Sequence, residues 1–288
     1  MSPYSAVQLF TLSAIWGASF LLIKFGVAEF PPAWVAALRL FFGAALLWSV
    51  LLIGKRAFAA RDKWSWLLLL GLVNNAIPFL FFAIAEQSVG SSLAAIINAT
   101  TTIFSALIAV SLRDSSFDLV NGAGVALGFA GVILAVSGGF SVGAASIGGV
   151  ALLLVASFCY ATSGFIAKRK LSGVPPIAIA TGQLSSALVF LLPIAAFSAP
   201  VVTPSPRALL AVLALGILGS GVAYLIMYDV LTKISAVQLS SVTYLLPLWG
   251  LFWGAIDGEH ITALSVIGVA VVLSSLYLIN LKPRVRAV

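Results

Sequence analysis

Long apolar runs separated by short polar stretches dominate this chain. A membrane-spanning helix needs about 20 consecutive, mainly apolar residues. Ten runs come close to that length or exceed it, and they are residues 5–27, 32–53, 64–85, 91–112, 117–136, 146–167, 176–198, 207–230, 236–256 and 261–281. Because these runs take up most of the 288 residues, little chain remains for a soluble domain. The pattern therefore predicts an all-α integral membrane protein with ten transmembrane helices.

Composition supports the same class. Hydrophobic residues make up 62% of the chain and charged residues 8%, whereas a soluble domain has about 45–50% apolar and about 25% charged residues. The first run lacks the basic start of a cleaved signal peptide and is too long for one, so we expect a permanent helix. The single cysteine, Cys159, excludes an internal disulfide.

Lysine and arginine residues are distributed unevenly between alternate loops, and cytoplasmic loops carry an excess of both. If the ten runs cross the membrane in turn, the loops of one side receive only Arg207. The other side receives Lys55, Arg56, Arg61, Lys63, Arg113, Lys168, Arg169, Lys170, Lys233, Lys282, Arg284 and Arg286. We expect a multi-pass protein of the bacterial inner (plasma) membrane with both termini cytoplasmic. The net charge of +7 then reflects topology and requires no nucleic-acid partner.

The two halves of the chain repeat one pattern. Residues 15–32 read IWGASFLLIKFGVAEFPP, and residues 159–176, displaced by 144 positions, read CYATSGFIAKRKLSGVPP. A serine, a lysine and a Pro-Pro pair coincide, and Trp16 aligns with Tyr160. Because each half has five spans, an odd number, the second half would be inverted relative to the first. We predict two inverted five-helix repeats, residues 1–140 and 145–288; chance likeness between apolar stretches is the alternative.

Three stretches carry a family pattern: LSAIWGASFLLIK (12–24), PPAWVAALRLFFGAALL (31–47) and SSVTYLLPLWGLFWGAIDGEHITALSVIGVAVVL (240–273). In them the chain resembles EamA-type transporters of the drug/metabolite transporter (DMT) superfamily. Pro247 and Glu259 match the pattern, while Thr102 stands at the position of the first half that corresponds to Pro247. The resemblance implies ten helices in two EamA-type repeats, around a cavity lined mainly by helices 1, 3, 4, 6, 8 and 9. It also implies export of amino acids, other metabolites or toxic compounds.

Polar and helix-breaking residues at mid-depth indicate a solute pathway, because lipid cannot satisfy them. Asn74 and Asn75 precede Pro78, which cannot donate a hydrogen bond to the carbonyl of Asn74. The corresponding run of the second half contains Gly-Ser-Gly at 219–221. Paired interruptions predict a binding site between the repeats. Packing kinks joined by asparagine hydrogen bonds are the alternative.

Further candidates for the substrate site lie in other runs. Asn98 and Thr101 share one face of the fourth run, and Ser241 and Tyr244 share one face of the ninth. Several aromatic rings also fall at mid-depth, where a cavity wall or simple helix packing would hold their polar atoms. The full set of candidate substrate-binding residues is Trp16, Ser19, Asn74, Asn75, Pro78, Asn98, Thr101, Tyr160, Ser163, Tyr224, Ser241 and Tyr244.

Charged residues near the helix ends suggest a gate or coupling group. Lys24 and Arg39 lie toward the outer ends of the first two runs, and Glu86 lies at the outer end of the third. Our hypothesis is that Glu86 pairs with Lys24 or Arg39 as an outer gate. Snorkelling of these side chains to the interface is the alternative. Asp229 and Lys233, spaced i,i+4, are more typical of a surface ion pair.

These features favour a secondary-type exporter working by alternating access. The runs carry no carboxylate at mid-depth for a polycation and no set of basic groups for a sugar phosphate, so we expect neutral or zwitterionic solutes, mainly apolar or aromatic amino acids. Alternatives are an exporter of monocationic drugs or quaternary ammonium compounds, and a channel-like facilitator. We expect no metal, no cofactor and no enzyme activity: the chain has one histidine, His260, and no phosphate-binding loop. The expected partners are a small-molecule substrate and the lipid bilayer, and the sequence is compatible with a monomer or a homodimer.

Overall fold

The structure, a computed structural model of the 288-residue chain, describes residues 2–55, 58–112, 119–137, 144–198, 203–231, 233, 239 and 242–280. Within these ranges every regular element is helical. The first-half elements are α1 (Pro3–Val27), α2 (Pro32–Ile53), η1 (Arg61–Lys63), α3 (Trp64–Gly71), η2 (Leu72–Ala76), α4 (Ile77–Ala85), α5 (Ser91–Asn98), α6 (Thr100–Ser111) and α7 (Leu119–Ser137). They are followed by α8 (Ala144–Lys170), α9 (Pro176–Ala196), α10 (Pro206–Gly216), η3 (Ile217–Val222), α11 (Ala223–Leu231), α13 (Val242–Ile256) and α14 (Ala263–Asn280).

Seven helical stretches of the described chain are long and apolar enough to cross a membrane. Three further apolar helices, Gly122–Ser137, Val242–Ile256 and Ala263–Ile279, are shorter. The prediction of an all-α membrane protein is therefore confirmed. The grouping into ten spans and two inverted repeats stays a prediction.

The outward faces of the helices carry large apolar side chains. Phe41 of α2 is 53% exposed, Val189 of α9 is 58% exposed and Leu210 of α10 is 63% exposed. A surface in contact with water rarely presents so much apolar area. The hydrocarbon core of a bilayer is the solvent that suits these faces.

The Pro-Pro pairs of the repeated pattern each start a helix. Pro31 is the N-cap residue of α2 and Pro175 is the N-cap residue of α9, and each is followed by a proline in the first helical turn. Proline suits this position because its fixed φ matches the helix and its missing N–H would have no partner there. The repeated sequence thus produces the same local structure twice.

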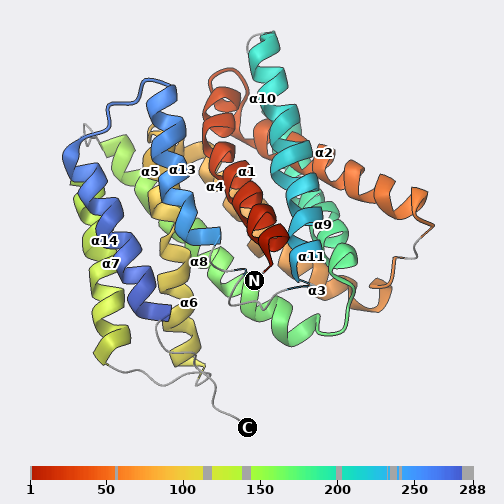
Figure 1. Cartoon of the computed structure of the whole chain (residues 1–288). Helices are drawn as coiled ribbons and strands as arrows, with labels where there is room; N and C mark the ends of the chain where they lie inside the picture. The colour runs from red at the N-terminus through yellow and green to blue at the C-terminus, as the bar shows by residue number, and fades with distance from the viewer. Residues whose placement is uncertain are drawn as a thin grey trace.

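The helix α1 lies near the centre of the bundle (Figure 1) and packs against α13 and α10. Helix α2 packs against α9, and α4 packs against α8. At one edge of the bundle α7 and α14 form a close pair. Gly124 and Gly128 allow this approach, because a Cβ on either would collide with Ile279 or Ser275 of α14. The small-residue pattern of 124–128 therefore packs within the chain.

Two helices contain a π-helical turn at the predicted interruptions. In η2 the N–H of Ile77 bonds to the carbonyl of Leu72, five residues earlier, just before Pro78. In η3 the N–H of Ala223 bonds to the carbonyl of Leu218, with the same five-residue spacing. Proline in the first case and glycines in the second weaken the regular helix. Such turns are frequent at functional sites.

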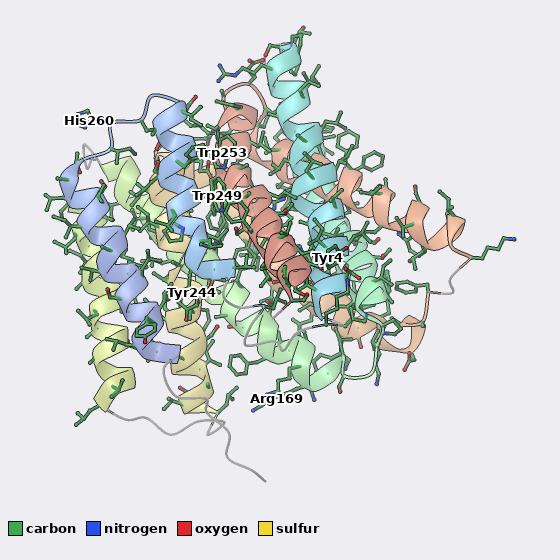
Figure 2. The ribbon with its side chains drawn as sticks, in the orientation of Figure 1. Tyr4, Arg169, Tyr244, Trp249, Trp253 and His260 are labelled. Atoms are coloured by element: carbon green, nitrogen blue, oxygen red, sulfur yellow. The ribbon has the colours of Figure 1, made fainter. Side chains whose placement is uncertain are left out.

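The helix bundle has two ends, marked by labelled residues in Figure 2. His260 lies in the loop between α13 and α14, and Arg169 lies near the end of α8, at the opposite end of the bundle. These are called below the His260 end and the Arg169 end.

Candidate functional site

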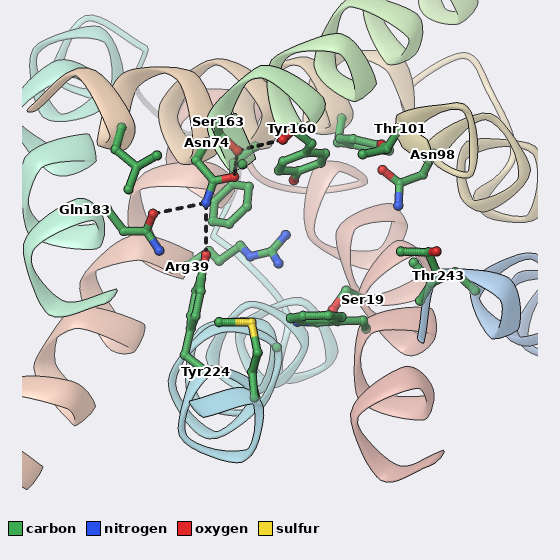
Figure 3. A pocket seen from close by; sticks show the side chains of 18 of the residues that line it. Ser19, Arg39, Asn74, Asn98, Thr101, Tyr160, Ser163, Gln183, Tyr224 and Thr243 are labelled. Atoms are coloured by element: carbon green, nitrogen blue, oxygen red, sulfur yellow. Dashed lines mark hydrogen bonds between the residues drawn. The ribbon is translucent and has the colours of Figure 1, made fainter. Parts of the chain in front are cut away.

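A cavity of about 470 Å³ lies between the helices and is drawn in Figure 3. Its size is typical of small-molecule sites, which span roughly 300–1,000 Å³. Of the candidate residues it brings together Trp16, Ser19, Asn74, Asn98, Thr101, Tyr160, Ser163 and Tyr224. Asn75, Pro78 and Tyr244 are not among the lining residues, and Ser241 lies outside the described residues. Helices α2 and α9 also line the cavity, through Arg39 and Gln183. These helices are the second and seventh of the ten predicted spans, which the family resemblance does not count among the main lining helices.

A hydrogen-bonded cluster forms one wall of the cavity (Figure 3). Asn74 Nδ2 donates to Gln183 Oε1 at 3.1 Å and to the Tyr224 hydroxyl at 3.4 Å. Ser163 Oγ donates to Asn74 Oδ1 at 2.6 Å. Asn75 lies behind this wall, fully buried, and its Nδ2 also donates to Tyr224 at 3.4 Å. The π-turn η2 thus presents Asn74 to the cavity and Asn75 to the surrounding helices.

A second polar group lies across the cavity, at the junction of α5 and α6. Asn98 Oδ1 and Thr101 Oγ1 are buried, and neither has a hydrogen-bond partner within the described chain. Thr100, by contrast, donates to the carbonyl of Ile97 at 2.7 Å. An unsatisfied buried acceptor is costly, so these two oxygens are available to a polar ligand.

The remaining wall is largely aromatic and apolar. The rings of Phe82 and Tyr160 lie 6.1 Å apart, and those of Phe20 and Phe82 lie 5.6 Å apart. Trp16 adds its indole from α1. Tyr244 has a different role, since its hydroxyl donates to the carbonyl of Leu276 at 2.8 Å and joins α13 to α14. For Tyr244 the helix-packing alternative therefore holds.

Among the described residues that line the cavity, Arg39 alone has a permanent charge. Its side chain is buried, with 8% of the residue exposed, and its guanidinium points into the cavity (Figure 3). Nε donates to Ser220 Oγ at 3.0 Å, and Cζ lies 3.7 Å from the centroid of the Phe79 ring. The sequence places Arg39 at a helix end, as a gate; the structure turns it inward from α2.

The predicted direct pairing of Glu86 with Lys24 or Arg39 is not observed among the described residues. Glu86 is 5% exposed, and neither of its oxygens has a hydrogen-bond partner among the described residues. Lys24 instead contacts Asp257 at 2.7 Å and Glu259 at 2.8 Å. Lys24 therefore takes its direct partners from the loop after α13, and Arg39 bonds to Ser220, so both cations act on Glu86 only at longer range.

The Lys24 contacts belong to a polar cluster that closes the His260 end. Glu259 Oε1 accepts from Ser91 N at 2.8 Å and from Ser91 Oγ at 2.9 Å, and Oε2 accepts from Ser92 N at 3.1 Å. Asp257 is also 3.6 Å from Arg207. The cluster, called below the seal, consists of Lys24, Ser91, Ser92, Asp257 and Glu259 and joins α1, α5 and the α13–α14 loop.

Glu259 is ionised within this cluster. Partial burial alone would raise the pKa of its carboxyl, but hydrogen bonds from Lys24 and Ser92, together with the Lys24 charge, lower that pKa from 4.5 to about 2. The N-terminal N–H groups of α5 also favour the negative charge. The seal is therefore an ion pair at neutral pH.

The cavity and the seal lie at different depths along the same path. Lining residues run from Ile23 of α1, one position before the seal residue Lys24, to Ala167 and Pro176 near the Arg169 end. At the His260 end a further contact joins Glu29 to Ser205, the N-cap residue of α10. The path is thus blocked at the His260 end, and its lining continues toward the Arg169 end.

The candidates chosen from the sequence omit Gln183, which lines the cavity, and Glu259, which belongs to the seal. Both positions nevertheless have a recognisable signal in the sequence. Gln183 is the isolated amide of its apolar run and lies 144 positions after Arg39, the same displacement as the repeat. Glu259 matches the family pattern and ends a short acidic loop. The predicted surface pair of Asp229 and Lys233 is confirmed, and Gln8 also donates to Asp229 at 2.6 Å.

A cavity with a polar and aromatic lining, enclosed by helices with apolar outer faces and blocked at one end, defines a membrane transporter. The family comparison agrees and makes this class specific. The chain belongs to the EamA-like transporter family of the DMT superfamily, whose model matches residues 4–137 and again residues 147–281. The resemblance seen in the sequence is therefore confirmed.

Related proteins are also named as transporters. The chain is 30% identical to the uncharacterized inner membrane transporter YedA of Escherichia coli strain K12 over 97% of this chain and 94% of the relative. It is 25% identical to a probable amino-acid metabolite efflux pump of Salmonella typhimurium, over 94% and 93% of the two chains. A solved crystal structure matches with a TM-score of 0.71 over 98% of each chain at 19% identity, which shows the fold alone.

Proposed function

We propose that this protein is a secondary transporter that exports small amphipathic metabolites, mainly amino acids with apolar or aromatic side chains, by alternating access. The observation that carries the proposal is a pairing of lining residues at the repeat displacement. Ten pairs are separated by 144 or 145 positions. They are Trp16 and Tyr160, Ser19 and Ser163, Phe20 and Gly164, Ile23 and Ala167, Arg39 and Gln183, Asn74 and Gly219, Phe79 and Tyr224, Phe82 and Met227, Asn98 and Thr243, and Thr101 and Leu246.

This pairing supports a site shared equally by two repeats, residues 1–140 and 145–288. In an inverted repeat, exchange of conformations between the halves opens one site to alternate sides of the membrane. The two π-turns, η2 and η3, lie at corresponding positions and supply the local irregularity that such sites use. The seal at the His260 end supports a carrier over a channel, because a channel path is open at both ends at once.

The chemistry of the lining supports an amphipathic solute. Aromatic rings and aliphatic side chains form most of the wall, and a few polar groups fix orientation. The name of the Salmonella typhimurium relative, a probable amino-acid metabolite efflux pump, agrees with amino acids as the solute class and export as the direction.

Counterflow in proteoliposomes tests this function. Vesicles loaded with unlabelled phenylalanine, leucine or alanine should accumulate the labelled amino acid transiently, and a channel-like facilitator should show no such stimulation. Replacing Trp16 or Tyr160 by Ala should reduce phenylalanine counterflow more than alanine counterflow, because the large ring loses its aromatic contacts. Phe41→Ala, on the outward face of α2, is the control and should transport like the parent. Equal rates for all variants would refute the site.

A further inference from the structure

We propose that Arg39 is the anchor for a carboxylate of the transported solute, so that the protein selects carboxylate-bearing solutes over amines and quaternary ammonium cations. This inference deepens the proposed function and rests on it. It follows from how the guanidinium is held, from what surrounds it, and from what lies across the cavity.

The guanidinium is fixed by contacts that leave its outer edge unused. Nε bonds to Ser220 in the π-turn η3, and the flat face of the group lies on Phe79 of α4. No hydrogen bond or ion pair to either Nη joins Arg39 to another described residue. A guanidinium presents its donors as a rigid fork that matches a carboxylate. The two Nη groups thus face the cavity and are free to donate hydrogen bonds to a carboxylate of the solute.

The charge of Arg39 has no counter-ion in the cavity wall. None of the lining residues that the structure describes is an aspartate or a glutamate. The carboxylates of Asp257 and Glu259 contact Lys24 in the seal. The buried Glu86 lies close enough to act on Arg39 electrostatically, but no hydrogen bond or ion pair joins the two among the described residues. An arginine is always charged, and a buried charge without a partner is unfavourable. An anionic ligand would remove that penalty, whereas a cationic ligand would increase it.

The opposite wall supplies what an amino acid also needs. Asn98 Oδ1 and Thr101 Oγ1 have no hydrogen-bond partner in the described part of the chain, and Figure 3 shows Arg39 and Asn98 pointing into the same space. A solute whose carboxylate binds Arg39 can donate from its ammonium group toward this wall. Only one cation lines the cavity among the described residues, which suits a single carboxylate better than a phosphate dianion.

Three phenyl compounds that share one ring test the inference on the wild-type protein in proteoliposomes. They are L-phenylalanine, 3-phenylpropionate, which lacks the ammonium group, and L-phenylalaninamide, which lacks the carboxylate. Competition with labelled phenylalanine counterflow should be strong for the first two. We expect phenylalaninamide to compete about 10-fold or more weakly, the loss expected for a charged hydrogen-bonded pair. Because this comparison uses the unmodified chain, it does not depend on a variant that folds.

The variant Arg39→Gln then assigns the selectivity to one residue. It should weaken competition by phenylalanine and 3-phenylpropionate by about 10-fold or more, and it should not weaken competition by phenylalaninamide, whose ammonium group no longer meets the Arg39 charge. Arg39→Lys should restore part of the selectivity, since it keeps the charge without the fork. Arg207→Gln is the matched control, because Arg207 also lies on an aromatic ring, Phe25 at 3.8 Å, but outside the cavity. It should not change the ratio between the acid and the amide.

Two results would overturn the inference. The first is that phenylalaninamide competes as strongly as phenylalanine in the wild-type protein. The second is that Arg39→Gln weakens competition by all three compounds equally. In both cases counterflow itself would persist and the proposed function would stand. Absence of counterflow with every amino acid of the panel would overturn the proposed function and this inference together.

Discussion

At the scale of single residues, we predict that the seal depends on the negative charge of Glu259, which accepts hydrogen bonds from Lys24, Ser91 and Ser92. Its pKa in the sealed state is about 2, below the ordinary 4.5, so the ionised form binds its partners more strongly than the protonated form. The stabilisation is fully present above pH 4.5 and is lost as the pH falls toward about 2. We expect the distance between spin labels at Ala28→Cys and Ala263→Cys to be constant from pH 7 to pH 5. A longer distance should appear as the pH falls below 4.5.

The variant Glu259→Gln controls for general effects of acid. It removes the titrating carboxyl and keeps one acceptor oxygen for the N–H donors of Ser91 and Ser92, because the amide NH2 group can only donate. We expect the longer distance to be populated already at pH 7 in this variant, and to change little on acidification. An equal response to acid in both proteins would mean that other groups govern the closure. The cysteine background for all labelling is Cys159→Ser.

Individual site residues were predictable from the sequence where their polarity conflicts with the membrane. Asn74 and Asn98 stand out in apolar runs, and both line the cavity. Arg39 was assigned to a helix end because a long side chain can snorkel from that position. Its inward direction depends on Phe79 and Ser220, which come from distant parts of the chain. Contacts of this kind leave no local trace in the sequence.

At the scale of helices, two glycines at corresponding positions make the same close approach. A Cβ on Gly71 would lie 2.6 Å from the carbonyl oxygen of Gln183 in α9, and a Cβ on Gly216 would lie 3.0 Å from the carbonyl oxygen of Arg39 in α2. We predict that Gly71→Ala and Gly216→Ala each destabilise the protein by about 1–3 kcal/mol, because backbone atoms must move apart. Thermal unfolding in detergent measures the change.

The matched control for both variants is Gly148→Ala in α8. A Cβ on Gly148 meets no atom within 4 Å, so alanine there should be neutral or slightly stabilising through its better helix propensity. Unfolding temperatures that drop in only one of the two variants, Gly71→Ala or Gly216→Ala, would argue against equivalent packing in the two halves. Unchanged temperatures in both would contradict the close approach itself.

Helix positions were predictable, but helix orientations were not. Proline pairs and long apolar runs fixed where α2 and α9 begin. In a water-soluble helix the apolar face reveals which side is buried. Here both the lipid-facing side and the packed side are apolar, as Val189 and Leu184 of α9 illustrate with 58% and 0% exposure. The periodic signal is therefore weak, and only glycines and isolated polar residues indicate the inner face.

At the scale of the whole molecule, the lining pairs and the glycine contacts have one explanation. The members of each lining pair are 144 or 145 positions apart, and so are Gly71 and Gly216 and their respective contacts Gln183 and Arg39. The family model matches the chain twice, over residues 4–137 and 147–281. Duplicated halves of opposite orientation would place equivalent residues on opposite walls of one cavity. Positions at which the two halves carry different residues then indicate functions that only one half performs. At the repeat displacement of 144 positions, Arg39 of the first half corresponds to Gln183 of the second. The charge that we assign to solute recognition therefore belongs to one half only.

The orientation in the membrane is the last prediction, and cysteine labelling tests it. The excess of Lys and Arg predicts that the Arg169 end is cytoplasmic. In intact cells, a membrane-impermeant thiol reagent should modify His260→Cys, and should modify Ser172→Cys only after permeabilisation. Ala167→Cys should behave like Ser172→Cys, because the cavity lining continues to that end while the seal blocks the other. Labelling of Ser172→Cys from outside would reverse the topology, and labelling of Ala167→Cys alone from outside would show that the seal is open in the cell.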